Sequence, residues 1–159
     1  MPIQGLSHLD SNFEKAIRFS IGDPADPSAG YEKYWADNPG DPGGLTIWGI
    51  CTKWWPDHVR AMKTQSKADA FLYAKHFYHQ QFWLWSGCDK LASGLDLVAF
   101  DTAILTGRER TAGWIKICHD WRDIIFLRLD YQAGLDRINK FFIEGWLERA
   151  IALWKLVKV

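Results

Sequence analysis

The first third of the chain mixes helical periodicity with turn-forming residues. Residues 13–21 place apolar side chains on one helical face, and Ser11-Asn12-Phe13-Glu14 in front of them has the form of a capping box. Gly22 then predicts the end of this helix. Asp26-Pro27 predicts a second short helix to about Trp35, because aspartate is a good N-cap and proline fits the first helical position.

Residues 37–51 leave the helical pattern. From Asp37 to Gly44 every position is aspartate, asparagine, proline or glycine, which predicts turns. The following segment, Leu45 to Cys51, is short, apolar and rich in β-branched residues. This segment predicts a strand or one arm of a hairpin.

The rest of the chain has helical periodicity. Ser66, with Asp69 three residues later, predicts the cap of one helix, and Gly107 predicts the end of another. Four apolar stripes mark these helices: Phe71, Ala74, Tyr78 and Phe82; Leu97, Phe100 and Ile104; Trp121, Ile124, Ile125 and Leu129; and Phe142, Trp146, Ala150, Leu153 and Val157. The pattern predicts a mainly α fold with a small β element near residues 45–51. At 159 residues, without internal repeats or linkers, the chain is predicted to form one domain, residues 1–159.

Composition narrows the class of protein. With 48% hydrophobic and 24% charged residues, the chain has the composition of a folded globular protein. The 19 basic residues balance the 19 acidic ones, which disfavours a nucleic-acid binder, since such proteins need an excess of positive charge. The 10 Trp, 9 Phe and 5 Tyr are numerous enough to fill a core and also to offer flat faces to sugar rings.

The expected location follows from signals that the sequence lacks. The segment from Met1 to Asp10 has neither the basic start nor the apolar centre of a signal peptide, and no apolar run reaches the roughly 18 residues of a membrane span. The 3 cysteines include no CxxC pair, which disfavours a disulfide scaffold. We expect synthesis in the cytoplasm, no membrane insertion, and a separate route of release for any role outside.

The strongest chemical pattern is formed by Glu32, Asp41 and Thr46 around the turn-forming segment. Two carboxylates near a tight turn suit glycoside hydrolysis, in which one acid protonates the leaving oxygen and a second group activates water. Thr46 could orient that water, and Gly43 and Gly44 would let a ligand approach the backbone. The same spacing is also typical of an ordinary turn beside a surface glutamate, and spacing alone favours that interpretation.

A resemblance to a known family bears on this choice. The stretch Asp41-Pro42-Gly43-Gly44-Leu45-Thr46-Ile47-Trp48-Gly49-Ile50 resembles the Asp-Pro-Gly-Gly-x-Thr-x-x-Gly-Ile signature of glycoside hydrolase family 108, the phage and prophage N-acetylmuramidases. Counting back at the family spacing leads to Glu32, the position of the family's catalytic glutamate. The Ala70–Tyr73, Phe100–Ala103 and Phe142–Arg149 segments resemble further family blocks, so that the resemblance extends from about residue 13 to residue 150.

The resemblance implies a lysozyme-like helical domain that cuts the bond between N-acetylmuramic acid and N-acetylglucosamine in peptidoglycan. Glu32 would be the general acid, Asp41 the base or an electrostatic stabiliser, and Thr46 the residue that holds water. Trp35 and Trp48, with Gly43 and Gly44, would bind the glycan. No cofactor or metal is expected. The family also implies an endolysin-like role, with holin-dependent release to the periplasmic wall, and a monomer is expected.

The chain departs from the family pattern beside its glutamate. The family's Gly-Gly-Tyr is Lys33-Tyr34-Trp35 here, and a competing alignment would put Ser28 at the acid's position; we prefer Glu32 because its register needs no gap before the turn. Two alternatives therefore stand beside the muramidase: an inactive wall-binding relative and a lytic transglycosylase. Glu32 facing Asp41 across an open groove would favour the enzyme, and Glu32 turned outward would favour the binding module.

Other candidate side chains have structural interpretations. Asp101 shares a helix face with apolar residues and is predicted to be a partly buried structural acceptor, bonded to the backbone or to a residue such as Arg128, rather than a catalytic group. His76 and His79 could share a metal, but amphipathic helix positions explain them better. Cys51 is predicted to be a buried small hydrophobe.

Overall fold

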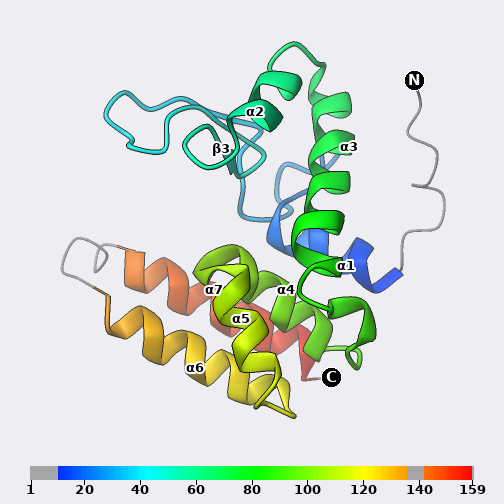
Figure 1. Ribbon diagram of the computed structural model, residues 1–159, viewed down its shortest axis with the longest axis vertical. Coiled ribbons are helices and arrows are strands. Elements are labelled where there is room, and N and C mark those ends of the chain that lie inside the picture. Colours follow the sequence, from blue (N-terminus) through cyan, green and yellow to red (C-terminus); the bar gives the residue numbers. More distant parts are fainter. Residues whose placement is uncertain (1–10, 136–141, 159) are drawn as a thin grey trace. The chain divides into compact units, whose positions relative to one another are not determined.

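The computed structural model describes residues 11–135 and 142–158 (Figure 1). The chain divides into two compact units, residues 1–81 and 82–159, and each is described by itself. The described residues form seven α-helices and one three-stranded antiparallel sheet. The predicted mainly α fold with a small β element is therefore confirmed, whereas organisation as one domain stays a prediction.

The first unit combines three α-helices with the sheet. Its elements are α1 (Ser11–Ser20), β1 (Trp35–Ala36), β2 (Thr46–Ile47), β3 (Ile50–Cys51), α2 (Pro56–Met62) and α3 (Lys67–Tyr78). A π-helical segment, η2 (His79–Leu84), continues the chain after α3. The predicted cap of α3 is confirmed, since the Ser66 hydroxyl accepts a hydrogen bond from the Asp69 amide at 3.1 Å. On the predicted stripe Phe71, Ala74 and Tyr78 are buried.

The sheet is a narrow ribbon with the strand order β1-β2-β3. Its paired residues are Trp35 with Ile47, Ala36 with Thr46, Thr46 with Cys51, and Ile47 with Ile50. Residues 45–51, predicted as a strand or one arm of a hairpin, form both arms, which are joined by Trp48 and Gly49. Strand β1 was not predicted. Trp48 and Gly49 both have positive φ, 48° and 81°. Positive φ at both central residues is the mark of a type I′ turn, whose twist matches that of the strands it joins.

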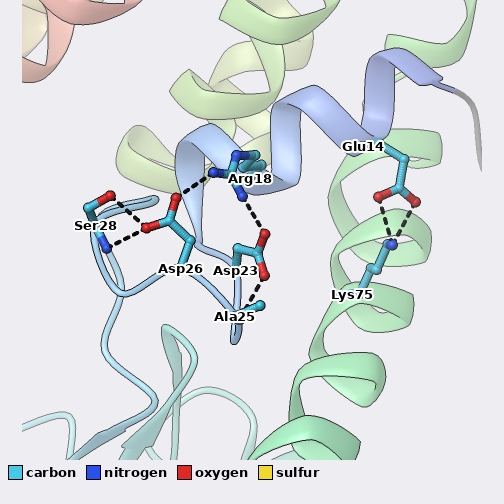
Figure 2. A network of polar contacts seen from close by, with 7 residues as sticks. All are labelled: Glu14, Arg18, Asp23, Ala25, Asp26, Ser28 and Lys75. Carbon is cyan, nitrogen blue, oxygen red and sulfur yellow. Dashed lines mark hydrogen bonds and ion pairs between the residues drawn. The ribbon is translucent and has the colours of Figure 1, made fainter.

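The helix predicted from Asp26 to Trp35 is wrong, because the chain forms consecutive turns there. The Asp26 carboxylate accepts hydrogen bonds from the Ser28 hydroxyl at 2.6 Å and the Ser28 amide at 3.0 Å, and Arg18 of α1 pairs with both Asp23 and Asp26 (Figure 2). The bonds from Ser28 lower the pKa of Asp26. An aspartate that can cap a helix can equally bond to the residue two positions ahead and form an Asx turn.

An ion pair joins α1 to α3. Lys75 lies 2.6 Å from the Glu14 carboxylate (Figure 2). Glu14, predicted to help cap α1, thus pairs with a residue far away in the sequence. Phe13 and Ile17 of the same helix are buried, as the apolar spacing predicts.

The second unit is helical throughout its described residues. It contains η3 (Cys88–Lys90), α4 (Leu95–Thr106), α5 (Arg108–Ile115), α6 (Trp121–Ala133) and α7 (Ile143–Val157). Gly107, with φ of 101°, ends α4 at the predicted place. Helix α4 packs against α5 and α6, and its Val98, Phe100 and Ala103 are fully buried.

A buried ion cluster joins three helices of this unit. Asp101 of α4 accepts hydrogen bonds from Arg128 of α6 at 2.7 Å and from Arg149 of α7 at 2.6 Å, and all three side chains are buried. The predicted role of Asp101 as a structural acceptor for a residue such as Arg128 is confirmed. Because a buried carboxylate needs paired donors, the aspartate fixes the positions of α6 and α7 against α4.

No helix among the described residues has the length and apolarity to cross a membrane. Residues 1–10, on which the expectation about a signal peptide rests, lie outside the described residues.

Candidate active site

Glu32 is held between the turns after α1 and the start of β1. Its amide donates a hydrogen bond to the carbonyl of Ile21 at 3.0 Å. Its half-buried side chain runs along the β2–β3 turn, where a Cβ built on Gly49 would lie 2.9 Å from both Cγ and Cδ of Glu32. The carboxyl group therefore uses space that only a glycine leaves free.

Tyr78, the last residue of α3, reaches the same glycine. The Cβ position on Gly49 lies 2.6 Å from the Tyr78 hydroxyl oxygen, and that hydroxyl donates to the carbonyl of Trp48 at 2.9 Å. The Glu32 carboxyl and the Tyr78 hydroxyl thus converge on one point of the turn. This role of Tyr78 was not predicted from the sequence. The available signal was that a tyrosine on a buried stripe needs a partner for its hydroxyl.

Trp48 supports the turn from within the unit. Its indole ring is only 4% exposed and lies 5.0 Å from the Phe71 ring and 5.7 Å from the Tyr34 ring, between centroids. Its amide donates to the backbone carbonyls of Lys33 and Tyr34, both at 3.1 Å. A left-handed conformation is costly for a bulky residue and persists only where the surroundings enforce it, as this packing does.

Asp41 lies in the long loop between β1 and β2 and is exposed. Its carboxylate accepts a hydrogen bond from the Gly43 amide at 2.8 Å, and its carbonyl accepts one from the Gly44 amide at 3.1 Å. The predicted turn chemistry is therefore confirmed. Gly44 has a φ of 70°, a conformation that favours glycine, and the Gly43 carbonyl accepts a bond from the Lys53 amide at 3.0 Å.

The two carboxylates belong to different parts of the ribbon. Glu32 lies beside the β2–β3 turn, whereas Asp41 belongs to the loop at the opposite end of the β1–β2 pairing. Thr46 pairs with Cys51 on β2, and its hydroxyl donates a hydrogen bond to the Gly44 carbonyl at 3.4 Å. The Glu32 side chain is thus directed along the β2–β3 turn and not outward.

Aromatic side chains near the site differ in exposure. Trp35 of β1 is 40% exposed and lies against Tyr34, with 6.1 Å between ring centroids. Trp54, which follows β3, is also exposed. Trp35 therefore presents an open face where Trp48 does not. Cys51, expected to be buried, is only half-buried on its two-residue strand.

A metal site would need several ligands close together. Among residues 11–135 and 142–158, no group of three or more His, Cys, Asp or Glu side chains could hold a metal ion. His79 instead packs its ring edge-to-face against Phe13, with 4.8 Å between centroids.

Comparison with known proteins identifies the family. Residues 29–107 match the family model described as Glycosyl hydrolase 108. The chain belongs to this family. The matched segment includes the Glu32, Asp41 and Thr46 positions, and also the Gly49 and Tyr78 that surround the glutamate.

A solved structure with the same fold is that of Brucella abortus SagA. The TM-score is 0.59, the sequence identity is 23%, and the match covers 79% of this chain and 86% of that chain. The predicted lysozyme-like helical fold is confirmed. None of the curated proteins compared with the chain matches it. Family and fold together support a glycosidase of the lysozyme-like, peptidoglycan-hydrolysing type.

Proposed function

We propose that this member of glycosyl hydrolase family 108 is an N-acetylmuramidase. It cleaves the β-1,4 bond between N-acetylmuramic acid and N-acetylglucosamine in peptidoglycan, with Glu32 as the general acid. The observation that carries the proposal is the seating of the Glu32 carboxyl against Gly49 beside the Tyr78 hydroxyl, inside the segment that matches the family.

The environment of Glu32 suits an acid that must give up a proton. A half-buried carboxyl beside a buried tyrosine and a glycine turn is shielded from bulk water on one side and remains reachable on the other. In the reaction Glu32 donates its proton to the glycosidic oxygen as the C–O bond breaks, and the sugar develops oxocarbenium character. Water then adds to the anomeric carbon and loses a proton, which completes hydrolysis.

Asp41 and Thr46 have the secondary roles. Asp41 carries an exposed carboxylate held by the Gly43 amide, which suits stabilisation of the positive charge or uptake of the proton from water. Thr46 lies on β2 of the same ribbon, and its hydroxyl suits placement of that water. We expect Asp41→Asn to reduce activity less than loss of Glu32, and Thr46→Ala to reduce it least.

We expect the glycan to bind at exposed surfaces near Glu32, Asp41 and Thr46. Trp35, with 40% of its surface exposed, offers its ring to a sugar. The Cβ positions of Gly43 and Gly44 face Asp41 and Thr52, so we expect their backbone groups to contact the glycan. Trp48 was expected to bind substrate, but its buried ring supports a packing role beneath the turn instead.

A lytic transglycosylase is the second candidate. It needs one acid and no positioned water, so it would require Glu32 but not the exposed Asp41, whose carboxylate is bonded to the Gly43 amide. The products distinguish the two, because hydrolysis leaves reducing ends and transglycosylation leaves 1,6-anhydro ends. An inactive wall-binding relative would leave the glycan intact.

The site of action follows from the family resemblance. We propose an endolysin-like role, in which the protein reaches the periplasmic wall after holin-dependent release. Expression alone in a Gram-negative host is expected to leave cells intact, and co-expression with a holin is expected to lyse them. Lysis without a holin would contradict this part of the proposal.

The experiment that tests the acid is Glu32→Gln, assayed by clearing of purified peptidoglycan. The amide keeps the shape of the side chain but has no transferable proton, so nearly all activity should be lost. The melting temperature should stay the same or rise slightly, since a partly desolvated acid costs stability. Glu109→Gln, a change of the same chemistry at an exposed position of α5, is the matched control and should remain active. A Glu32→Gln protein that clears the wall at the wild-type rate would overturn the assignment.

A further inference from the structure

Helix α7 exposes a stripe of large apolar side chains in the second unit. Leu147, Ile151 and Trp154 recur at helical spacing, and Ile151 in the middle is 46% exposed. The buried face of the same helix is formed by other residues, with Ala150 and Leu153 in the core. More than a third of each stripe side chain thus remains exposed beside a helix face that already packs in the core. Contiguous exposed apolar surface of this kind is typical of an interaction site.

The stripe is held in place by neighbours from α6. The Trp154 ring packs edge-to-face on Trp121, with 4.8 Å between centroids, and the Arg122 guanidinium lies 5.9 Å from the Trp154 ring centre. These contacts fix one end of the stripe in a single orientation. A preordered surface loses little conformational entropy when a partner covers it.

Charged residues along α7 are arranged about Ile151. Glu144 and Glu148 precede it, while Lys155 and Lys158 follow it, and all four are exposed. Glu144 and Lys158 lie equally far from Ile151 in the sequence, and Glu148 and Lys155 each lie within about one helical turn of it. One half of the helix face is therefore acidic and the other half basic.

We infer that α7 is the docking surface for a second copy of this chain. Two α7 helices cross in antiparallel orientation about a two-fold axis at Ile151, so that the apolar stripes cover each other. In this arrangement the acidic half of each helix faces the basic half of its partner. Such an isologous contact is self-complementary: if a residue of one copy contacts a second residue on the partner, the two-fold axis repeats this contact with the copies exchanged.

The charge pattern favours this occupant over a lipid surface. An interfacial helix that binds anionic membranes carries mainly lysine and arginine on its polar face. The face around Ile151 instead carries Glu144 and Glu148 as well as Lys155 and Lys158, so it offers no net attraction to anionic lipid. The dimer replaces the monomer expected from the sequence and does not depend on the proposed muramidase activity.

The test is sedimentation velocity of the full chain from low micromolar to several hundred micromolar. The wild-type protein should shift from monomer to dimer with increasing concentration. Ile151→Glu places two carboxylates at the axis and should abolish the shift. Ile117→Glu is the matched control, since Ile117 is 70% exposed in the same unit but lies between α5 and α6, and it should dimerise as the wild type does.

Charge reversal tests the antiparallel orientation. Glu148→Lys or Lys155→Glu alone should weaken dimerisation about tenfold, because each reversal turns two attractive pairs into repulsive ones. The double variant with both reversals should recover the wild-type affinity. A helix that merely needs these charges for its own stability would not show this recovery.

Three results would overturn the inference. They are a chain that stays monomeric over the whole range, dimerisation that survives Ile151→Glu, and a double variant no better than the single ones. A second outcome would assign the stripe to a membrane instead. In that outcome the chain stays monomeric, cosediments with phosphatidylglycerol vesicles, and loses this binding with Ile151→Glu. Circular dichroism of each variant verifies that α7 is still folded.

Discussion

Replacement of Gly49 by alanine is the most incisive structural perturbation of the site. The added methyl group would lie 2.6 Å from the Tyr78 hydroxyl oxygen and 2.9 Å from Cγ and Cδ of Glu32, whereas ordinary contacts of a Cβ begin near 3.4 Å. Either the glutamate or the turn has to move. A displacement of about 1 Å in a catalytic group can cost roughly 100-fold in rate, and we expect a loss of kcat of that order.

Two free-energy costs add up in this variant. Gly49 has a φ of 81°, and a left-handed conformation costs an alanine about 1–2 kcal/mol relative to glycine. Overpacking of a close-packed site adds about 1–3 kcal/mol. Gly87→Ala distinguishes the conformational cost from the overpacking cost, because Gly87 has a φ of 75° but nothing within 4 Å of its Cβ position. It should show only the conformational cost and keep full activity.

The assay combines urea unfolding with the rate of peptidoglycan clearing. Gly49→Ala should lose more stability than Gly87→Ala and should lose activity out of proportion to that difference. If both variants lose the same stability and both stay active, Glu32 does not occupy the space beside Gly49, and the proposed seating of the acid is wrong.

Two further predictions concern the second unit and the cysteines. Asp101→Asn should lower the free energy of unfolding, measured by urea titration, by about 3–5 kcal/mol, because it leaves two buried arginines without their carboxylate. Asp89→Asn, at an exposed position, should have little effect. Equal effects of the two changes would refute the role of the cluster. Burial raises the pKa of the Cys88 and Cys118 thiols, so at neutral pH a thiol reagent should label the half-buried Cys51 first in the native protein; labelling of all three thiols at one rate would contradict this.

Local signals in the sequence were sufficient to predict much of the fold. Ser66 capped α3 as expected, and Gly107 ended α4, because caps and terminal glycines act through hydrogen bonds and dihedral angles within a few residues. The local signal at Asp26 led to a wrong prediction, because its carboxylate bonds to Ser28 in a turn and does not start a helix. Both outcomes satisfy the same local chemistry, so only the tertiary context decides between them.

The candidate site was only partly accessible from sequence for a related reason. The motif pointed to Glu32, Asp41 and Thr46, but the position of each carboxylate depends on how the ribbon pairs. Tyr78 lies 46 positions beyond Glu32 in the numbering, and its part in the site arises only when α3 packs beside the β2–β3 turn. Long-range contacts of this kind leave no periodic pattern in the chain.

The central claim, that the enzyme hydrolyses the muramic acid linkage, is tested most directly by the chemistry of the new chain ends. Purified peptidoglycan is digested with the wild-type protein, reduced with borohydride and analysed by mass spectrometry, with Glu32→Gln as the blank. Muramidase activity would leave reduced muramic acid at the new ends, and none would form with the variant. Reduced glucosamine, 1,6-anhydro ends that resist reduction, or glycan that stays intact would each contradict the central claim.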